Sequence, residues 1–229
     1  MRQIITLNAA SPEIQYLCKK DTRLAKLISM VGPISYEVYD DQYEFIVHKI
    51  IEQMLSLKAG NKIFSKLIDL CRGKVTPEAV SKLTDEEIKS IGTAASKVSY
   101  IRSVTEATLD DSLDYKALET MPDDEVFKEL TAIKGIGKWT ANMYLIFVLN
   151  RMDILPTNDA AFLQAYEWLY KTTDRSDTSI INRCKKWKPY SSVASRYLYR
   201  ALDEGFTKEE FHLFKQQEEN ILWQTLKHI

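Results

Sequence analysis

The chain has 229 residues, of which 31 are Lys or Arg and 32 are Asp or Glu, so its formal net charge is -1. This length allows a sizeable core in one domain, and the balanced charge excludes a protein that binds nucleic acid through overall basicity. Any DNA contact must come from a local patch. No apolar run reaches the roughly 20 residues of a membrane span, and the amino terminus lacks the apolar centre of a signal peptide. We therefore expect an intracellular protein that does not bind membranes.

The helical period dominates the sequence. Apolar residues recur at helical spacing from Leu24 onward, which predicts an all-α protein of roughly ten helices joined by loops of ordinary length. Alternation typical of strands is weak and occurs only in RQIITL, residues 2–7, and ISYEVY, residues 34–39. Any strands should therefore be short and peripheral.

Cysteines and histidines form no recognisable metal or redox motif. Their number and spacing argue against a disulfide framework, a zinc site and an iron-sulfur cluster. The sequence also contains no Walker loop, no GxSxG motif and no internal repeat. The dispersed residues are Cys18, Cys71 and Cys184, and His48, His212 and His228.

The most informative segment spans residues 123–150, where two predicted helices flank KGIG, residues 134–137. Asp123 and Asp124 suit the first turn of the first helix, and the second helix begins directly after the second glycine. Gly135 and Gly137 are expected to adopt conformations that a side chain would obstruct and to let a ligand approach the backbone. Free N-H groups at the start of the second helix could hold an anion, most naturally a DNA phosphate. A plain corner between two helices is the alternative.

The second helix leads to LPTND, residues 155–159, and then to a further predicted helix over residues 160–170. Asp159 is thereby expected in a loop or at the N-cap of that helix, where Asp is a favoured residue. Asp153 is the rival acid of this segment, and we interpret it as a solvated turn residue.

Together these segments resemble the helix-hairpin-helix DNA glycosylases. Residues 130–159, LTAIKGIGKWTANMYLIFVLNRMDILPTND, are similar to the family's hairpin and to the loop with its catalytic aspartate. Residues 50–67 are similar to the family's early helix and loop, and residues 187–202, WKPYSSVASRYLYRAL, resemble the 3-methyladenine DNA glycosylase II branch. The order and spacing of these segments make the resemblance specific.

The resemblance implies one glycosylase domain over residues 1–229, with two helical lobes around a DNA-binding cleft. One lobe is expected to combine about residues 1–40 with 170–229, and the other to span about residues 41–169 with the hairpin. The hairpin and Asp159 should face the cleft. The implied partner is double-stranded DNA that contains damaged bases, and we expect the protein to act as a monomer.

Asp159 is the catalytic residue that the resemblance implies. A carboxylate stabilises the positive charge that builds on the sugar as the N-glycosidic bond breaks, and it helps to orient or deprotonate the attacking water. In relatives that also nick the strand, a lysine at the place of Trp139 forms a Schiff base with the sugar. Lys138 is adjacent but points about 100° away around the helix. The resemblance therefore implies a monofunctional glycosylase of base excision repair.

Three further residues are implied to form the base pocket. A flipped base is held by stacking, and the indole of Trp139 suits a positively charged alkylated purine. Tyr199 lies where bacterial relatives carry a second pocket tryptophan, although a core tyrosine would fit the same pattern. Met143, one turn after Trp139, replaces an aromatic residue of some relatives. The predicted substrates are 3-methyladenine and 7-methylguanine; oxidised or deaminated bases, or non-catalytic DNA binding, are the alternatives.

Met54 resembles the apolar residue that the family inserts into the duplex, with Gln53 beside it and Leu55 as the second candidate. A core methionine is the alternative interpretation. Glu52 departs from the family, and a carboxylate near phosphates would weaken binding. No cofactor is required, but the resemblance implies Na+ or K+ at the hairpin when DNA is bound, held by the carbonyls of Thr131, Ile133 and Ile136. DNA backbone contacts are expected from Gly135, Gly137, Lys134, Lys138, Lys186 and Lys188.

Overall fold

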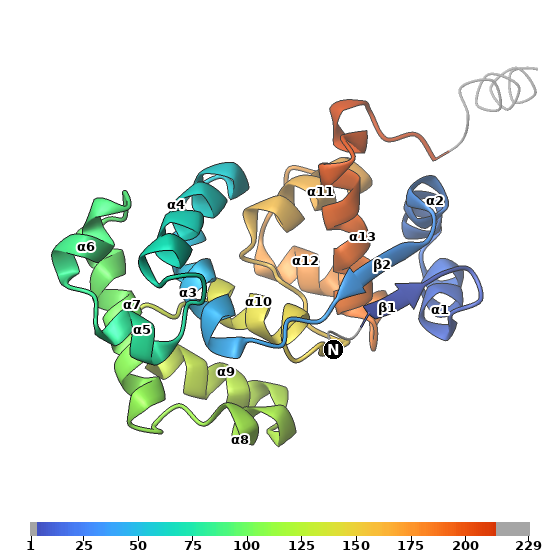
Figure 1. Ribbon diagram of the computed structural model, residues 1–229. Coiled ribbons are helices and arrows are strands. Elements are labelled where there is room, and N and C mark those ends of the chain that lie inside the picture. The colour runs from blue at the N-terminus through green and yellow to red at the C-terminus, as the bar shows by residue number, and fades with distance from the viewer. Residues whose placement is uncertain (1–3, 214–229) are drawn as a thin grey trace, which may run out of the picture. The chain divides into compact units, whose positions relative to one another are not determined.

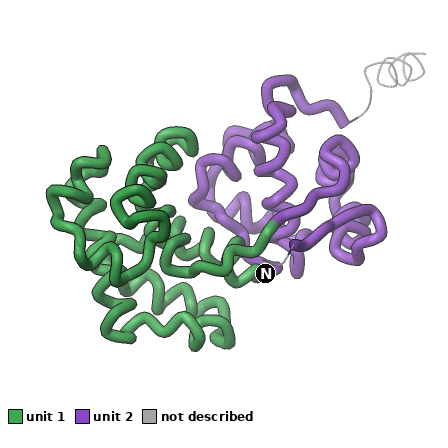
Figure 2. The backbone as a smooth tube through the Cα atoms, viewed as in Figure 1, with its two compact units in different colours: residues 1–3, 37–151 green, residues 4–36, 152–229 purple. Residues whose placement is uncertain are grey.

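The computed structural model describes residues 4–213, and within this range the chain is mostly helical, as the periodicity predicts (Figure 1). The described chain forms two compact units (Figure 2). In the described range, unit 1 comprises residues 37–151, and unit 2 combines residues 4–36 with residues 152–213. The predicted lobes had their limits near residues 40 and 169, so the structure differs mainly in assigning residues 152–169 to unit 2.

Within residues 38–151 of unit 1, the regular secondary structure consists of helices. Its helices begin with side-chain caps where the sequence offers them: the Ser56 hydroxyl accepts from the Ala59 N-H at 3.3 Å, and Thr84 and Glu87 form a reciprocal capping box. Helix α3 packs against α4, α7 and α10, and α9 packs against α10. The helices are α3 (Gln42–Glu52), α4 (Leu57–Leu70), α5 (Pro77–Ser81), α6 (Asp85–Ser90), α7 (Ala95–Leu109), α8 (Tyr115–Thr120), α9 (Asp123–Ala132) and α10 (Lys138–Phe147).

Unit 2 adds a small sheet to its helices. The two expected short strands are confirmed: β1 (Ile4–Leu7) and β2 (Ile34–Glu37) pair with each other. Helix α13 packs against α2 and α11. The other elements are α1 (Pro12–Lys20), α2 (Thr22–Val31), α11 (Ala160–Tyr170), α12 (Asp177–Cys184), the 3-10 helix η1 (Lys185–Trp187), α13 (Ser191–Asp203) and the 3-10 helix η2 (Phe206–Lys208).

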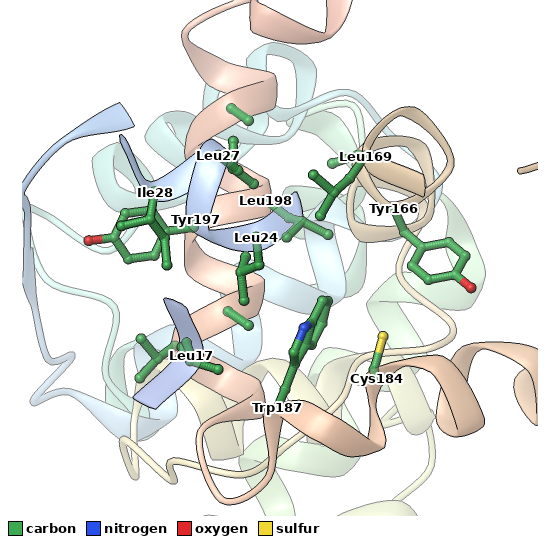
Figure 3. Close-up of a cluster of buried hydrophobic side chains, with 14 of the residues drawn as sticks. Leu17, Leu24, Leu27, Ile28, Tyr166, Leu169, Cys184, Trp187, Tyr197 and Leu198 are labelled. Atoms are coloured by element: carbon green, nitrogen blue, oxygen red, sulfur yellow. The ribbon is translucent and has the colours of Figure 1, made fainter. Parts of the chain in front are cut away.

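The core of unit 2 is organised around a buried tryptophan and a buried aspartate. Trp187 is fully buried among leucines such as Leu17, Leu24 and Leu198 (Figure 3). Its indole N-H donates to the Asp21 carboxylate at 2.9 Å, and the same carboxylate caps α2 by accepting from the Leu24 N-H at 3.2 Å. The charge of Asp21 is thus satisfied inside an apolar core, as a buried carboxylate requires.

The three cysteines are free thiols, and burial raises the pKa of each above its ordinary value. Thiols of this kind are poor nucleophiles, so we assign them packing roles. None of the described helices is both long enough and apolar enough to cross a membrane.

Candidate DNA-binding and active site

The predicted hairpin is confirmed between α9 and α10. The Ile136 N-H donates to the Ile133 carbonyl at 3.0 Å and closes the turn, while the Ile136 side chain is buried. Gly135 has a φ of +97°, and a Cβ there would lie 2.2 Å from the Cβ of Tyr100 on α7. Gly135 is therefore required both by its backbone conformation and by packing.

The prediction that Gly137 needs a conformation closed to other residues is wrong. Its φ of -91° is open to any residue, and a Cβ there would meet no atom within 4 Å. It forms the N-cap of α10 and has no side chain to cap the first turn. The open space and the uncapped N-H groups leave this helix start accessible to an anion. Lys134 and Lys138, on either side of the two glycines, are exposed.

A second loop of unit 1 is bonded to the hairpin. The side-chain amide of Gln53 donates to the Gly135 carbonyl at 2.9 Å and to the Thr140 hydroxyl at 3.2 Å. Met54, the next residue, has a φ of 59° and a relative exposure of 101%. The alternative interpretation of Met54 as a core residue is therefore wrong. Leu55, the second candidate for insertion, is also exposed, to 41%.

Glu52 is removed from solvent despite its place beside this loop. The side chain is 5% exposed and pairs with the Lys49 ammonium, and its second oxygen lies 3.2 Å from Nε2 of His48. Burial lowers the pKa of His48. A Cβ on Gly60 would lie 2.7 Å from the Glu52 side chain, which shows how closely α4 covers it. The carboxylate is thus compensated within unit 1, so the expected weakening of DNA binding loses its physical basis.

Two pocket candidates lie on α10. Trp139 is half-buried in the first turn of α10, and Met143 is buried one turn later, 4% exposed. Residues four apart lie on the same helix face, so the two side chains share a surface of α10. Lys138 is exposed beside Trp139, as its position around the helix predicts. The participation of Trp139 and Met143 in a base pocket stays a prediction.

Asp159 is confirmed as the N-cap of α11. Its carboxylate accepts from the Phe162 N-H at 2.7 Å, and the residue is 6% exposed. Tyr199 on α13 belongs to the same unit, and its ring packs partly against the core. Burial, followed by the negative charge of Asp159, raises the pKa of Tyr199 well above its ordinary value. A neutral tyrosine hydroxyl therefore accompanies the fixed carboxylate.

Asp153 is held by other residues and is not the solvated turn residue that we expected. The Ser191 hydroxyl donates to its carboxylate at 2.5 Å, and the Lys188 ammonium lies 3.2 Å away. Both partners belong to the start of α13 or the loop before it. Asp153 thus anchors the start of α13. The catalytic role of Asp159 stays a prediction.

Three basic residues that precede α13 have partners within unit 2, namely Arg183, Lys186 and Lys188. Lys186 pairs with the buried Asp21 carboxylate at 3.0 Å, in addition to the Lys188 pair described above. The Arg183 guanidinium lies 5.0 Å from the ring centre of Tyr170. The sequence alone does not predict these contacts, because every partner is distant along the chain. DNA binding by Lys186 and Lys188 stays a prediction.

Comparison with known proteins gives the family. The model of the HhH-GPD superfamily of base excision DNA repair proteins matches residues 47–189, which include both the hairpin and Asp159. The chain belongs to this superfamily. The superfamily fold also accounts for the helical hairpin in unit 1.

Several named proteins are similar to this HhH-GPD protein over most of their length. A DNA-3-methyladenine glycosidase structure from Bacillus halodurans is 32% identical, with 91% of this chain and 97% of that chain covered and a TM-score of 0.79. A Schizosaccharomyces pombe 3-methyladenine DNA glycosylase, solved with abasic DNA, is 25% identical, with 90% and 100% covered and a TM-score of 0.77. DNA-3-methyladenine glycosylase 1 of the same yeast is 28% identical over 86% of this chain and 88% of its own length.

The cation that the resemblance implies at this HhH-GPD hairpin would be bound by three backbone carbonyl oxygens. The carbonyls of Thr131, Ile133 and Ile136 lie at the end of α9 and in the turn, and the Ile133 carbonyl already accepts one hydrogen bond. A carbonyl oxygen has two lone pairs, so that oxygen retains one for a cation. Neutral carbonyl oxygens suit a hard cation of low charge. A Na+ or K+ ion at this turn stays a prediction.

Proposed function

We propose that this chain is a monofunctional DNA-3-methyladenine glycosylase that releases alkylated purines in base excision repair. Family membership and the relatives named above support the activity. The observation that carries the catalytic assignment is Asp159, whose carboxylate is fixed by an N-cap hydrogen bond and almost fully buried. A fixed carboxylate of this kind can stabilise positive charge without rearranging during the reaction.

Asp159 would act on the sugar as the bond to the base breaks. An N3- or N7-methylated purine is cationic, so it leaves as a neutral base when it takes the electron pair of the glycosidic bond. The positive charge then resides on C1′ and the ring oxygen of the sugar, where the Asp159 carboxylate stabilises it. Water adds its oxygen to C1′ and gives a proton to the carboxylate. The products are a free base and an abasic site.

Relatives that nick the strand carry a lysine amine at one position of the hairpin, and this chain has no amine at that position. Trp139 occupies that position, and an indole does not form a Schiff base. Its half-buried ring is instead proposed to stack on the extruded base, beside Met143 on the same face of α10. The pocket role expected of Tyr199 stays a prediction. The absence of a positioned amine is the reason we propose hydrolysis alone.

DNA is proposed to bind through its backbone at the hairpin. The uncapped N-H groups at the start of α10 would hold a phosphate, and Lys134 and Lys138 would add positive charge. Met54 would fill the gap that the extruded nucleotide leaves, because its apolar side chain is fully exposed. Lys186 and Lys188 are proposed as a weaker second contact, since each already carries a carboxylate partner.

Purified protein is expected to release free methylated purines from alkylated duplex DNA. The reaction should leave alkali-labile abasic sites and no nicked strands before alkali is added. Chromatography of the released bases and gel analysis of the DNA measure the two properties separately. Release of oxidised or deaminated bases alone would overturn the substrate assignment, and nicking without alkali would overturn the monofunctional mechanism.

Replacement of Met54 by Gly is expected to stabilise the fold and to impair the enzyme. A non-glycine residue at a φ of 59° is strained, so glycine should raise the free energy of unfolding by about 0.5 to 1 kcal/mol. Loss of the inserted side chain should lower base release from duplex DNA about tenfold. Urea denaturation and single-turnover rates measure the two effects.

Arg72 gives a matched control for this prediction. It follows α4, is exposed and has a φ of 58°, but lies outside the proposed site. Arg72→Gly should therefore give a similar stabilisation without a change in rate. An equal loss of rate in both variants would refute the role of Met54.

A further inference from the structure

The loop that carries Met54 is held by a lysine from another helix. Nζ of Lys97, in the first turn of α7, donates to the Ile51 carbonyl at 2.7 Å and to the Gln53 carbonyl at 2.6 Å. These carbonyls lie at the carboxyl end of α3, where the helix leaves its last acceptors unpaired. A cation also complements the negative end of the helix dipole. Lys97 thus fixes the position at which the chain leaves α3.

The same face of α7 also supports the hairpin. Tyr100 lies three residues after Lys97, so the two side chains share one side of the helix. Tyr100 is the residue against which Gly135 packs without room for a Cβ. The Gln53 amide then joins the two supported segments by donating to the Gly135 carbonyl at 2.9 Å. Helix α7 therefore backs both the Met54 loop and the hairpin.

We propose that Lys97 is a positioning residue for the insertion of Met54 into the duplex. The Gln53 carbonyl that Lys97 binds belongs to the peptide group that leads directly into Met54. Fixing this peptide holds Met54 in its left-handed conformation with the side chain fully exposed. The entropy of ordering the inserted residue is then lost during folding instead of during DNA binding. This inference rests on the proposed glycosylase function and deepens it.

The partly buried state of Lys97 agrees with a fixed role. Burial lowers the pKa of its ammonium group, and the two short hydrogen bonds to carbonyls compensate for lost water. Lys97→Met retains an unbranched side chain that is one atom shorter and removes the donors, whereas Lys97→Arg retains a charged donor. Lys66→Met is a matched control, because Lys66 of α4 also donates to a backbone carbonyl, that of Ile91, at 3.2 Å.

The test compares two DNA substrates that differ only in whether the lesion must be extruded. One duplex holds a single 7-methylguanine paired with cytosine, and in the other the same lesion is a bulge without an opposing base. Insertion of Met54 should assist extrusion from the first substrate more, because a paired base costs more free energy to unstack than an unpaired one. We expect Lys97→Met to lower the ratio of the paired to the bulged single-turnover rate about tenfold. Lys97→Arg should restore most of it, and Lys66→Met should leave it unchanged.

Double substitution separates positioning from a general loss of stability. If Lys97 acts through Met54, the ratio for Lys97→Met with Met54→Ala should equal that for Met54→Ala alone. The positioning role would be overturned if the double variant lowered the ratio by the product of the two single effects. An unchanged ratio in Lys97→Met, when the wild type is active, would also overturn it. Neither outcome would affect the proposed glycosylase function. A folded wild type that releases base from neither substrate would overturn the proposed function and this inference with it.

Discussion

Asp159→Asn is expected to lower the rate of methylated-purine release by at least about 100-fold and to leave the fold intact. The amide cannot balance positive charge on the sugar and cannot accept the proton of the attacking water. Asn is as good an N-cap as Asp, so the hydrogen bond from the Phe162 N-H should persist. Single-turnover rates on alkylated duplex DNA and thermal unfolding of both proteins measure the two effects.

Asp153→Asn is the matched control in the same segment. Its carboxylate binds the Ser191 hydroxyl and pairs with Lys188, so its substitution should disturb the start of α13 more than the chemistry. We expect a rate per folded molecule within about threefold of the wild type. Equal losses of rate in the two variants, with both folds intact, would contradict the assignment of Asp159.

The features that the sequence predicted correctly depend on neighbours along the chain. The hairpin and the N-cap at Asp159 follow from residue types and spacing within a few positions of each other. The two short strands and the dominance of helices follow from periodicity for the same reason. The chemical role of Asp159 comes from the family resemblance alone and stays a prediction, because a position at a helix start does not specify it.

The features that the sequence could not predict depend on contacts between distant residues. Lys97 carries no motif, and its two carbonyl partners precede it by more than 40 positions. The pairing of Lys186 with Asp21, and the cover that Gly60 gives Glu52, likewise arise only when the helices pack. Helical spacing alone left Met54 open to a core position as the alternative, but α3 ends at Glu52 and leaves Met54 exposed. A charge or an apolar residue therefore acquires its role from its tertiary partners.

The two hairpin glycines should respond differently to alanine. Gly135→Ala forces a positive φ on a residue with a Cβ and places that atom 2.2 Å from Cβ of Tyr100, which cannot move without shifting α7. We expect a loss of about 3 to 5 kcal/mol in the free energy of unfolding, and loss of duplex binding by the remaining folded protein. The second effect is expected because the displaced Gly135 carbonyl can no longer accept from Gln53.

Gly137→Ala should instead change the free energy of unfolding by at most about 1 kcal/mol, since its φ is ordinary and the added methyl group meets no protein atom. That methyl group occupies the space through which a phosphate would approach the N-H groups of α10. We therefore expect affinity for a duplex with an abasic-site analogue to fall about 5- to 10-fold, measured by fluorescence anisotropy. Unaltered affinity in a folded Gly137→Ala protein would exclude the start of α10 as the phosphate site and would leave Gly137 as part of a structural corner alone.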